Sequence, residues 1–203
     1  MEITNIKQMI NSESELLYPN SKLPENISPT YDLLIDYFFF PEKSKLNPKK
    51  GLFIKGEIGV GKTAMITIFR NILRQIQRGF NVVSCRYIVR DFMKSGAEII
   101  DRYGRYSFAK SDRDTFDIEK PIIYCFDELG IEDTNSKLYG NQSNIMAEIL
   151  IDRYEKLISN GMITHVTTNL TPDACEALYG NRLRDRMREM FNVITITGKS
   201  NRK

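Results

Sequence analysis

The stretch that decides the fold is Gly56-Glu57-Ile58-Gly59-Val60-Gly61-Lys62-Thr63. Its spacing, G-x-x-x-x-G-K-[ST], is that of a phosphate-binding loop. A triphosphate has to be wrapped by backbone N–H groups, and residues without a Cβ let the main chain turn tightly and approach the anion. Gly56, Gly59 and Gly61 provide this freedom. The stretch therefore predicts a site for a nucleoside triphosphate.

Each polar group of this loop has a predicted role. Lys62 offers an ammonium to the β- and γ-phosphates, and Thr63 offers a hydroxyl to Mg²⁺. A helix that begins near Gly61 points the positive end of its dipole at the same anion. The predicted nucleotide-binding residues are Gly56, Glu57, Ile58, Gly59, Val60, Gly61, Lys62, Thr63 and Ala64.

The flanks of the loop have the required pattern. Leu52-Phe53-Ile54 is typical of a short buried strand, and residues 64–77 have the period of a helix. The apolar face of that helix consists of Met65, Ile68, Phe69, Ile72, Leu73 and Ile76. A glycine-rich turn that only happens to contain a lysine would need neither flank.

Composition bounds the class of protein. With 203 residues, 41% apolar and 27% charged, we expect one main α/β domain. No run of about 18 apolar residues exists, and residues 1–5 have neither the basic start nor the apolar segment of a signal peptide. We therefore expect a cytoplasmic protein without a transmembrane segment.

The sequence offers no metal-ligand cluster of cysteine and histidine. Cys85, Cys125 and Cys175 are odd in number and lie in or beside apolar segments, so we expect them to be reduced core residues. His165 is the only histidine and has no such neighbour at ligand spacing. A zinc site is not expected.

Positive charge is concentrated at the C-terminal end. From Arg182 to Lys203 there are seven Lys or Arg against two acids, while the formal net charge of the whole chain is only +3. Such a cluster suits a phosphate-bearing partner, and a solvated basic tail would have the same composition.

The first fifty residues show little periodicity and are divided by prolines. Only residues 30–40 are predicted to be helical, with Thr30 as a cap and Pro41 as the stop. This lead-in either packs its aromatic residues on the domain, beside the nucleotide base, or docks another protein. We expect a boundary between residues 1–50 and an ATPase domain at 51–203.

A second strand is predicted at 81–87, a helix at 89–103 and a polar loop at 104–120. Basic and aromatic residues alternate around that loop, which is the composition that holds single-stranded nucleic acid, although an ordinary surface loop needs no such role. They are Arg102, Tyr103, Arg105, Tyr106, Phe108, Lys110 and Arg113.

The next predicted strand, residues 122–126, is apolar and ends in two acids, Asp127 and Glu128. A carboxylate at the carboxyl end of a parallel strand reaches the ligand edge of the sheet, so we assign Asp127 to Mg²⁺ and Glu128 to the attacking water. Two acids that simply open a surface turn are the alternative. An acid at Glu128 favours a hydrolysing ATPase over a small-molecule kinase.

A helix at 145–159, ended by Gly161, and a strand at 162–169 follow. The strand ends in Asn169, whose amide is predicted to hold the attacking water or the γ-phosphate. A turn residue before Thr171-Pro172 is the alternative.

The last segment has an arginine at every second position, and a fifth strand is predicted at 193–197. On a helix Arg182 and Arg186 share one face, while Arg184 and Arg188 lie nearly opposite, so no single surface uses all four. One of the four could act as an arginine finger on the γ-phosphate of a neighbouring subunit.

Together these blocks resemble the AAA+ ATPases of the DnaC-type helicase-loader and IstB-type transposition-helper family over residues 52–203. Residues 56–63 match Walker A, 126–130 match the acidic Walker B ending and 167–170 match sensor 1. Residues 182–187 resemble box VII, which implies that Arg186 is the finger. Residues 198–202 are similar to the G-x-S-x-R ending, which makes Arg202 a candidate nucleotide sensor.

Three features depart from the family pattern. Many members have a second aspartate where this chain has Glu128, the loop at 56–59 lacks the prolines common in AAA+ loops, and residues 1–50 contain no recognisable zinc- or helicase-binding module. The protein partner therefore cannot be transferred from the family.

The resemblance implies a five-stranded parallel sheet of order 5-1-4-3-2, helices on both faces and a helical lid that is reduced or absent. It implies a Mg·ATP-dependent DNA-replication accessory protein like a helicase loader, which assembles as a homo-oligomer on single-stranded DNA and hydrolyses ATP slowly in isolation. A replicative helicase is one candidate partner. The alternatives are a transposition ATPase with a transposase partner, a small-molecule kinase and a nucleotide-binding adaptor that does not hydrolyse.

Overall fold

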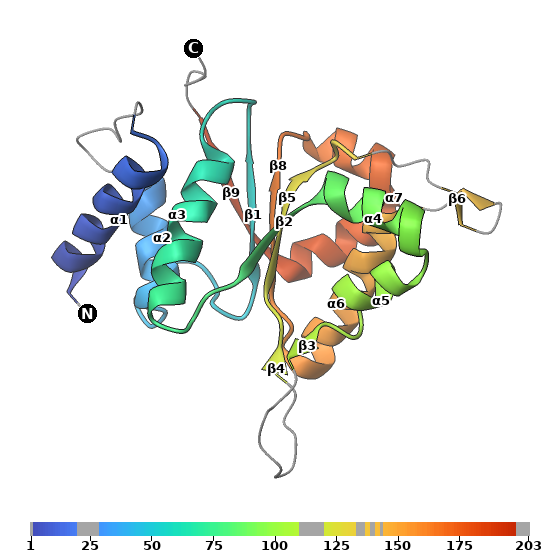
Figure 1. The fold of residues 1–203 in the computed structure, drawn as a ribbon, viewed down its shortest axis with the longest axis horizontal. Helices are drawn as coiled ribbons and strands as arrows, with labels where there is room; N and C mark the ends of the chain where they lie inside the picture. The colour runs from blue at the N-terminus through green and yellow to red at the C-terminus, as the bar shows by residue number, and fades with distance from the viewer. Residues whose placement is uncertain are drawn as a thin grey trace, which may run out of the picture.

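The structure, a computed structural model, describes residues 2–19, 29–109, 120–132, 137–138, 141–142 and 144–197. A parallel sheet of five strands lies at its centre (Figure 1). The strands are β1 (Gly51–Gly56), β2 (Asn81–Ser84), β5 (Tyr124–Leu129), β8 (Thr164–Thr168) and β9 (Phe191–Ile196).

The order across the sheet is β2-β5-β8-β1-β9, and every neighbouring pair is parallel. Counted along the chain, these five strands have the order 5-1-4-3-2 from the β9 edge, so the predicted topology is confirmed. Two short antiparallel hairpins lie outside the sheet: β3 (Phe108–Ala109) with β4 (Lys120–Pro121), and β6 (Lys137–Leu138) with β7 (Asn141–Gln142).

Helices cover both faces of the sheet. Figure 1 shows α1 (Ile3–Leu17), α2 (Pro29–Phe39) and α3 (Lys62–Gln75) on one side. The other side holds α4 (Cys85–Ser95), α5 (Glu98–Tyr103), α6 (Ile145–Asn160) and α7 (Pro172–Met190). Each side has its own hydrophobic cluster.

Strand β1 shows how the sequence builds two clusters. Side chains alternate between the two faces of a strand. Leu52 and Ile54 belong to the cluster under α1, α2 and α3, whereas Phe53 packs against the cluster under α4 to α7. Because both faces are covered, the strand reads as a continuous apolar run.

Helix α1 is not predicted from the sequence. Its buried stripe is narrow, because only Ile6, Ile10 and Ser14 are buried along fifteen residues. Ile6 and Ile10 lie in the same cluster as β1 and α3, and aromatic residues of α2 join them. Aromatic residues of the lead-in therefore pack on the domain, as in the first of the two alternatives, while a place beside the nucleotide base and the boundary at residue 50 stay predictions.

The second predicted strand and helix have different limits in the structure. Strand β2 ends at Ser84, and α4 begins at Cys85, because Cys85, Ile88, Val89 and Phe92 recur with the helical period and are all buried. The predicted single helix at 89–103 is also wrong, since it is interrupted at Gly96, where φ is 67°.

Other boundaries shift by two residues. Strand β5 begins at Tyr124 rather than residue 122, and β8 begins at Thr164 rather than residue 162. In the part of the chain that the structure describes, only Thr197 follows β9, and no lid helix is present there. No described helix is long and apolar enough to span a bilayer.

Candidate nucleotide site

The phosphate-binding loop joins β1 to α3 as predicted. Gly59 and Gly61 have φ angles of 88° and 92°, a region that residues with a Cβ seldom enter, so the loop needs glycine at both positions. Lys62 curls back into the loop, and its Nζ donates to the carbonyl oxygens of Gly56 at 2.7 Å and Glu57 at 2.8 Å. The ammonium is thus held inside the curve of the loop.

Asp127 lies directly across from this loop. Thr63 Oγ1, in the first turn of α3, is 3.0 and 3.1 Å from the two carboxylate oxygens of Asp127, which lies in the carboxyl-terminal half of β5. Asp127 is only 7% exposed. A hydroxyl and a carboxylate at this separation are the hard oxygen ligands that Mg²⁺ accepts alongside phosphate oxygens, so the two residues fit the predicted metal role.

Thr167, for which the sequence predicted no separate role, completes this cluster. Its Oγ1 donates to Asp127 Oδ1 and accepts from the backbone N–H of Glu128 at 2.9 Å. Thr167 is fully buried in β8, next to β5. The available signal was a run of hydroxyl residues at the end of a strand, adjacent to the strand that ends in the two acids.

Glu128 and Asn169 lie at the same edge of the sheet. Glu128 is half-buried and has a φ of 61°, which is unusual for a residue other than glycine. Asn169 is exposed and directly follows β8. The parallel pairing of β1, β8 and β5 brings both residues to the carboxyl ends of the strands, beside the phosphate loop.

Among the described residues, no group of three or more His, Cys, Asp or Glu side chains could hold a metal ion alone. The three cysteines are all buried and free. Burial raises the pKa of the Cys125 thiol, and the charge of the nearby Asp127 raises it further.

Comparison with solved structures identifies the fold. The chain is similar to the crystal structure of DnaI, with a TM-score of 0.60, 20% identity and 93% of each chain covered. It is also similar to the crystal structure of the DnaC helicase loader, with a TM-score of 0.52, 19% identity and coverage of 86% of this chain and 93% of that one. The chain has the AAA+ fold.

A third similar structure is the replication initiator DnaA bound to AMPPCP and single-stranded DNA, with a TM-score of 0.54 and 15% identity over 89% of this chain and 49% of that one. No protein-family model matches the chain. A protein of Schizosaccharomyces pombe, described as uncharacterized protein C115.02c, is 26% identical over 144 residues, which are 70% of this chain and 28% of that protein. The chain therefore spans less than a third of this curated relative.

The four arginines of α7 have different surroundings. Arg186 lies with its Cζ 5.0 Å from the centre of the Tyr154 ring, and its Nη1 is buried without a hydrogen-bond partner. Arg184 pairs with Glu176, and Arg188 pairs with Asp185. Arg182 is exposed. A finger acts across a subunit boundary, so the assignment to Arg186 stays a prediction; Arg202 lies outside the described residues.

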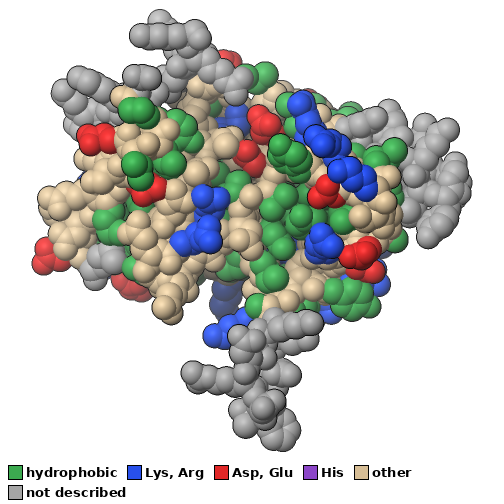
Figure 2. All heavy atoms as spheres, in the orientation of Figure 1, with side chains coloured by type: hydrophobic (Ala, Val, Ile, Leu, Met, Phe, Trp, Pro, Cys, Tyr) green, Lys and Arg blue, Asp and Glu red, His purple; other side chains and the backbone are tan. Residues whose placement is uncertain are grey.

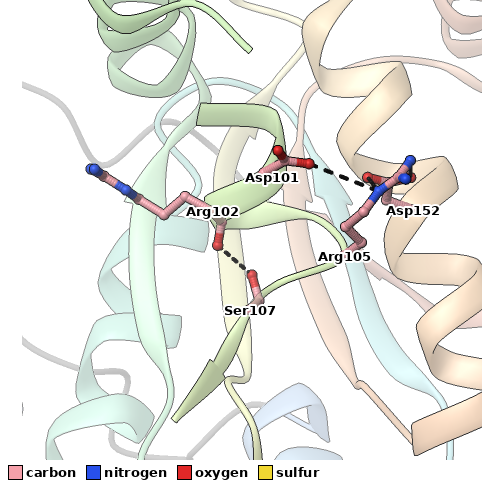
Figure 3. A network of polar contacts seen from close by, with 5 residues as sticks. All are labelled: Asp101, Arg102, Arg105, Ser107 and Asp152. Carbon is pink, nitrogen blue, oxygen red and sulfur yellow. Dashed lines mark hydrogen bonds and ion pairs between the residues drawn. The ribbon is translucent and has the colours of Figure 1, made fainter. Parts of the chain in front are cut away.

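Several residues of the predicted nucleic-acid loop form contacts within the chain. Arg105 forms an ion pair with Asp152 of α6 at 2.9 Å and lies 3.9 Å from Asp101. Figure 3 shows Arg105 directed at Asp152. Ser107 Oγ donates to the carbonyl oxygen of Arg102 at 2.6 Å, and the Arg102 guanidinium pairs with Glu98. Lys110 and Arg113 lie outside the described residues.

A different surface combines free cations with an aromatic ring. The exposed face of α4 carries Arg86, Tyr87, Arg90, Met93 and Lys94, and Figure 2 shows Lys and Arg side chains gathered over this helix. Arg90 lies over the Tyr87 ring at 5.7 Å. Within the described ranges none of the three cations forms an ion pair.

The end of α1 reaches the neighbourhood of the site. Burial raises the pKa of Tyr18, and the charge of Asp127 raises it further. Tyr18 directly follows α1, so the end of this unpredicted helix lies close enough to Asp127 for the carboxylate charge to act on the Tyr18 hydroxyl.

Proposed function

We propose that the chain is an ATP-binding and ATP-hydrolysing DNA-replication accessory protein of the helicase-loader type, which acts as a nucleotide-switched assembly on single-stranded DNA. The observation that carries this proposal is the cluster formed by Thr63, Asp127 and Thr167. Three distant segments of the chain meet there within hydrogen-bond distance, beside a glycine-rich loop that holds a lysine.

Binding would use the loop and its lysine. The N-terminal amides of α3 and the loop amides wrap the phosphates, and the Lys62 ammonium exchanges the carbonyl oxygens of Gly56 and Glu57 for phosphate oxygens. Thr63 and Asp127 would hold Mg²⁺, which neutralises charge on the β- and γ-phosphates when bound.

Hydrolysis would depend on the two residues beside this cluster. Glu128 polarises the attacking water, and Asn169 holds that water or the γ-phosphate. Arg186 of one subunit completes the site of its neighbour, so ATP binding drives assembly and hydrolysis releases it. Isolated protein should therefore hydrolyse ATP slowly, at a rate that rises with protein concentration.

The test is ATP turnover with and without single-stranded DNA. We expect stimulation by DNA that is lost in Glu128→Gln and in Arg186→Ala, while Glu128→Gln still binds Mg·ATP in calorimetry and Lys62→Ala does not. Arg188→Ala is the matched control, because it removes the same charge from the same helix. Turnover absent at every protein concentration would favour a nucleotide-binding adaptor, and phosphate transferred to an added metabolite would favour a kinase.

The DNA surface is proposed to be the exposed face of α4. Its cations can contact phosphates, and the Tyr87 ring offers a stacking platform for a base. The control surface is the loop before β1, where Lys43, Lys45 and Lys49 are also exposed. Removing the α4 cations should weaken binding of a labelled oligonucleotide, whereas removing the three lysines should not.

The protein partner is proposed to be a replicative helicase, and a transposase is the alternative. DnaI and the DnaC helicase loader share the fold, which leaves both partners open. A pull-down with immobilised Glu128→Gln protein and Mg·ATP decides between them. Recovery of the helicase supports the loader, and recovery of a transposase replaces it.

A further inference from the structure

The turn that carries Glu128 is held by side chains at three successive residues. The N–H of Glu128 and the carbonyl oxygen of Leu129 are bound by the two threonines at the end of β8, at 2.9 and 2.6 Å. The N–H of Gly130 donates to Glu132 Oε2 at 2.7 Å. One backbone group of each residue from 128 to 130 is therefore held by a side chain, from Thr167, Thr168 or Glu132.

The backbone of this turn needs such support. Glu128 has a φ of 61° and Gly130 a φ of 98°. A non-glycine residue in the left-handed region persists only where its surroundings enforce it, and such positions cluster at functional sites. A Cβ on Gly130 would lie 2.5 Å from Cδ1 of Leu170, so the space around the turn is also filled.

Glu132 connects this turn to α7. Its second carboxylate oxygen, Oε1, accepts a hydrogen bond from the Tyr179 hydroxyl. Glu132 is 6% exposed and Tyr179 is 8% exposed, so the contact is shielded from water. Burial raises the pKa of Tyr179, and the charge of Glu132 raises it further, so the hydroxyl keeps its proton and donates it to the carboxylate.

Tyr179 stands at a joint in α7. The next residue, Gly180, has φ 80° and ψ 159°, which are not helical values, and the helix kinks there. The half of α7 beyond the kink carries all four arginines from Arg182 to Arg188. The same carboxylate thus touches the turn of Glu128 on one side and the residue before this joint on the other.

We propose that Glu132 and Tyr179 are positioning residues, which hold Glu128 in its working conformation and couple the Glu128 turn to the arginine-bearing half of α7. This inference rests on the proposed ATPase function. Glu132 accepts from both Gly130 and Tyr179, so a change in the turn on loss of the γ-phosphate moves Tyr179. Gly180 lets the following half-helix respond without unfolding.

Three variants separate this role from simple packing. Tyr179→Phe removes the hydroxyl and keeps the ring. Glu132→Gln keeps both contacts, because its carbonyl oxygen accepts from Gly130 and its amide donates to the tyrosine oxygen. Tyr37→Phe is the matched control: Tyr37 is equally buried, at 6%, and its hydroxyl donates to the Lys50 carbonyl oxygen at 2.8 Å, away from the turn.

Amide hydrogen exchange without nucleotide tests the positioning. We expect the segment 127–132 to exchange about tenfold faster in Tyr179→Phe than in the wild type, and at wild-type rates in Glu132→Gln and Tyr37→Phe. Exchange with Mg²⁺ and a non-hydrolysable ATP analogue tests the coupling. The wild type should show a nucleotide-dependent change in segment 181–190 that Tyr179→Phe lacks.

Turnover adds a second readout. In Tyr179→Phe we expect kcat to fall about tenfold while nucleotide affinity changes by less than about threefold, because the contact acts on Glu128 and not on the phosphate loop. Equal exchange in segment 127–132 of Tyr179→Phe and wild type, or a preserved response of 181–190 in Tyr179→Phe, overturns the inference. A wild type that shows the exchange response and no turnover refutes the ATPase function and leaves the coupling standing.

Discussion

Lowering the pH from 7.5 to 5 should destabilise the protein through His165, the only histidine in the chain. The side chain is 2% exposed and packed among aromatic rings, with the Phe80 ring centre 5.0 Å away. Its Nδ1 accepts the backbone N–H of Leu52 at 3.1 Å. Protonation would place a charge in this apolar site and would also remove the acceptor.

The size of the effect follows from the pKa of His165, which burial, with a smaller contribution from the Arg153 charge, lowers from 6.5 to about 3. Between these two values the unfolded chain binds a proton that the folded chain does not. The free energy of unfolding therefore falls as the pH falls below 6.5, and this loss continues to about pH 3. At pH 5 it amounts to about 2 kcal/mol, at 1.36 kcal/mol for each pH unit.

The assay is urea unfolding of the wild type and of His165→Asn from pH 7.5 to 5. The substituted side chain would offer an amide oxygen near the place of Nδ1 and cannot titrate, so carboxylates that titrate in both proteins cancel in the difference. We expect the wild type to be the more stable at pH 7.5 and to lose about 2 kcal/mol of this advantage by pH 5. If the difference in the free energy of unfolding between the two proteins stayed constant from pH 7.5 to 5, the reasoning would be refuted.

Three further predictions follow from the described contacts. Thr167→Val removes the hydroxyl between Asp127 and the Glu128 N–H. The rate of ATP hydrolysis, measured as phosphate produced, should therefore fall about tenfold or more, while ATP affinity in calorimetry stays close to that of the wild type. Arg153→Met leaves three backbone carbonyl oxygens without their donor, so the free energy of unfolding, measured with urea, should fall by about 3 kcal/mol or more. Replacing Arg86, Arg90 and Lys94 together by Ala should reduce the slope of log K against log salt for single-stranded DNA by about 2, and an unchanged slope would exclude α4 as the DNA surface.

The sequence predicted the phosphate loop and its sheet well, because their signals are local. Only the glycine spacing of residues 56–63 and an apolar strand before it were needed to place β1 and α3. The pairing of Thr63 with Asp127 also followed, since parallel strands bring their carboxyl ends to one edge. Thr167 was missed because a threonine at a strand end has many uses, and only the register of β8 against β5 selects this one.

Helix α1 was missed for a different physical reason. A surface helix is recognised by a broad apolar stripe, and α1 buries only two isoleucines and a serine. Its position is decided by α3, whose own apolar face is wide enough to accept a second layer. Tertiary packing therefore determines this helix more than its own periodicity does.

Charged residues show where sequence reasoning stops. Arg105 was grouped with possible DNA contacts, yet it is held by Asp152, a residue forty-seven positions later in the chain. Arg153, the residue after Asp152, is fully buried, and its guanidinium donates to carbonyl oxygens from three segments. Burial lowers the pKa of Arg153 to about 9. A sequence specifies a cation but not its partner. The exposed cations of α4 are the better DNA candidates because the fold leaves them without one in the part of the chain described, so a phosphate backbone would not have to compete with an internal carboxylate.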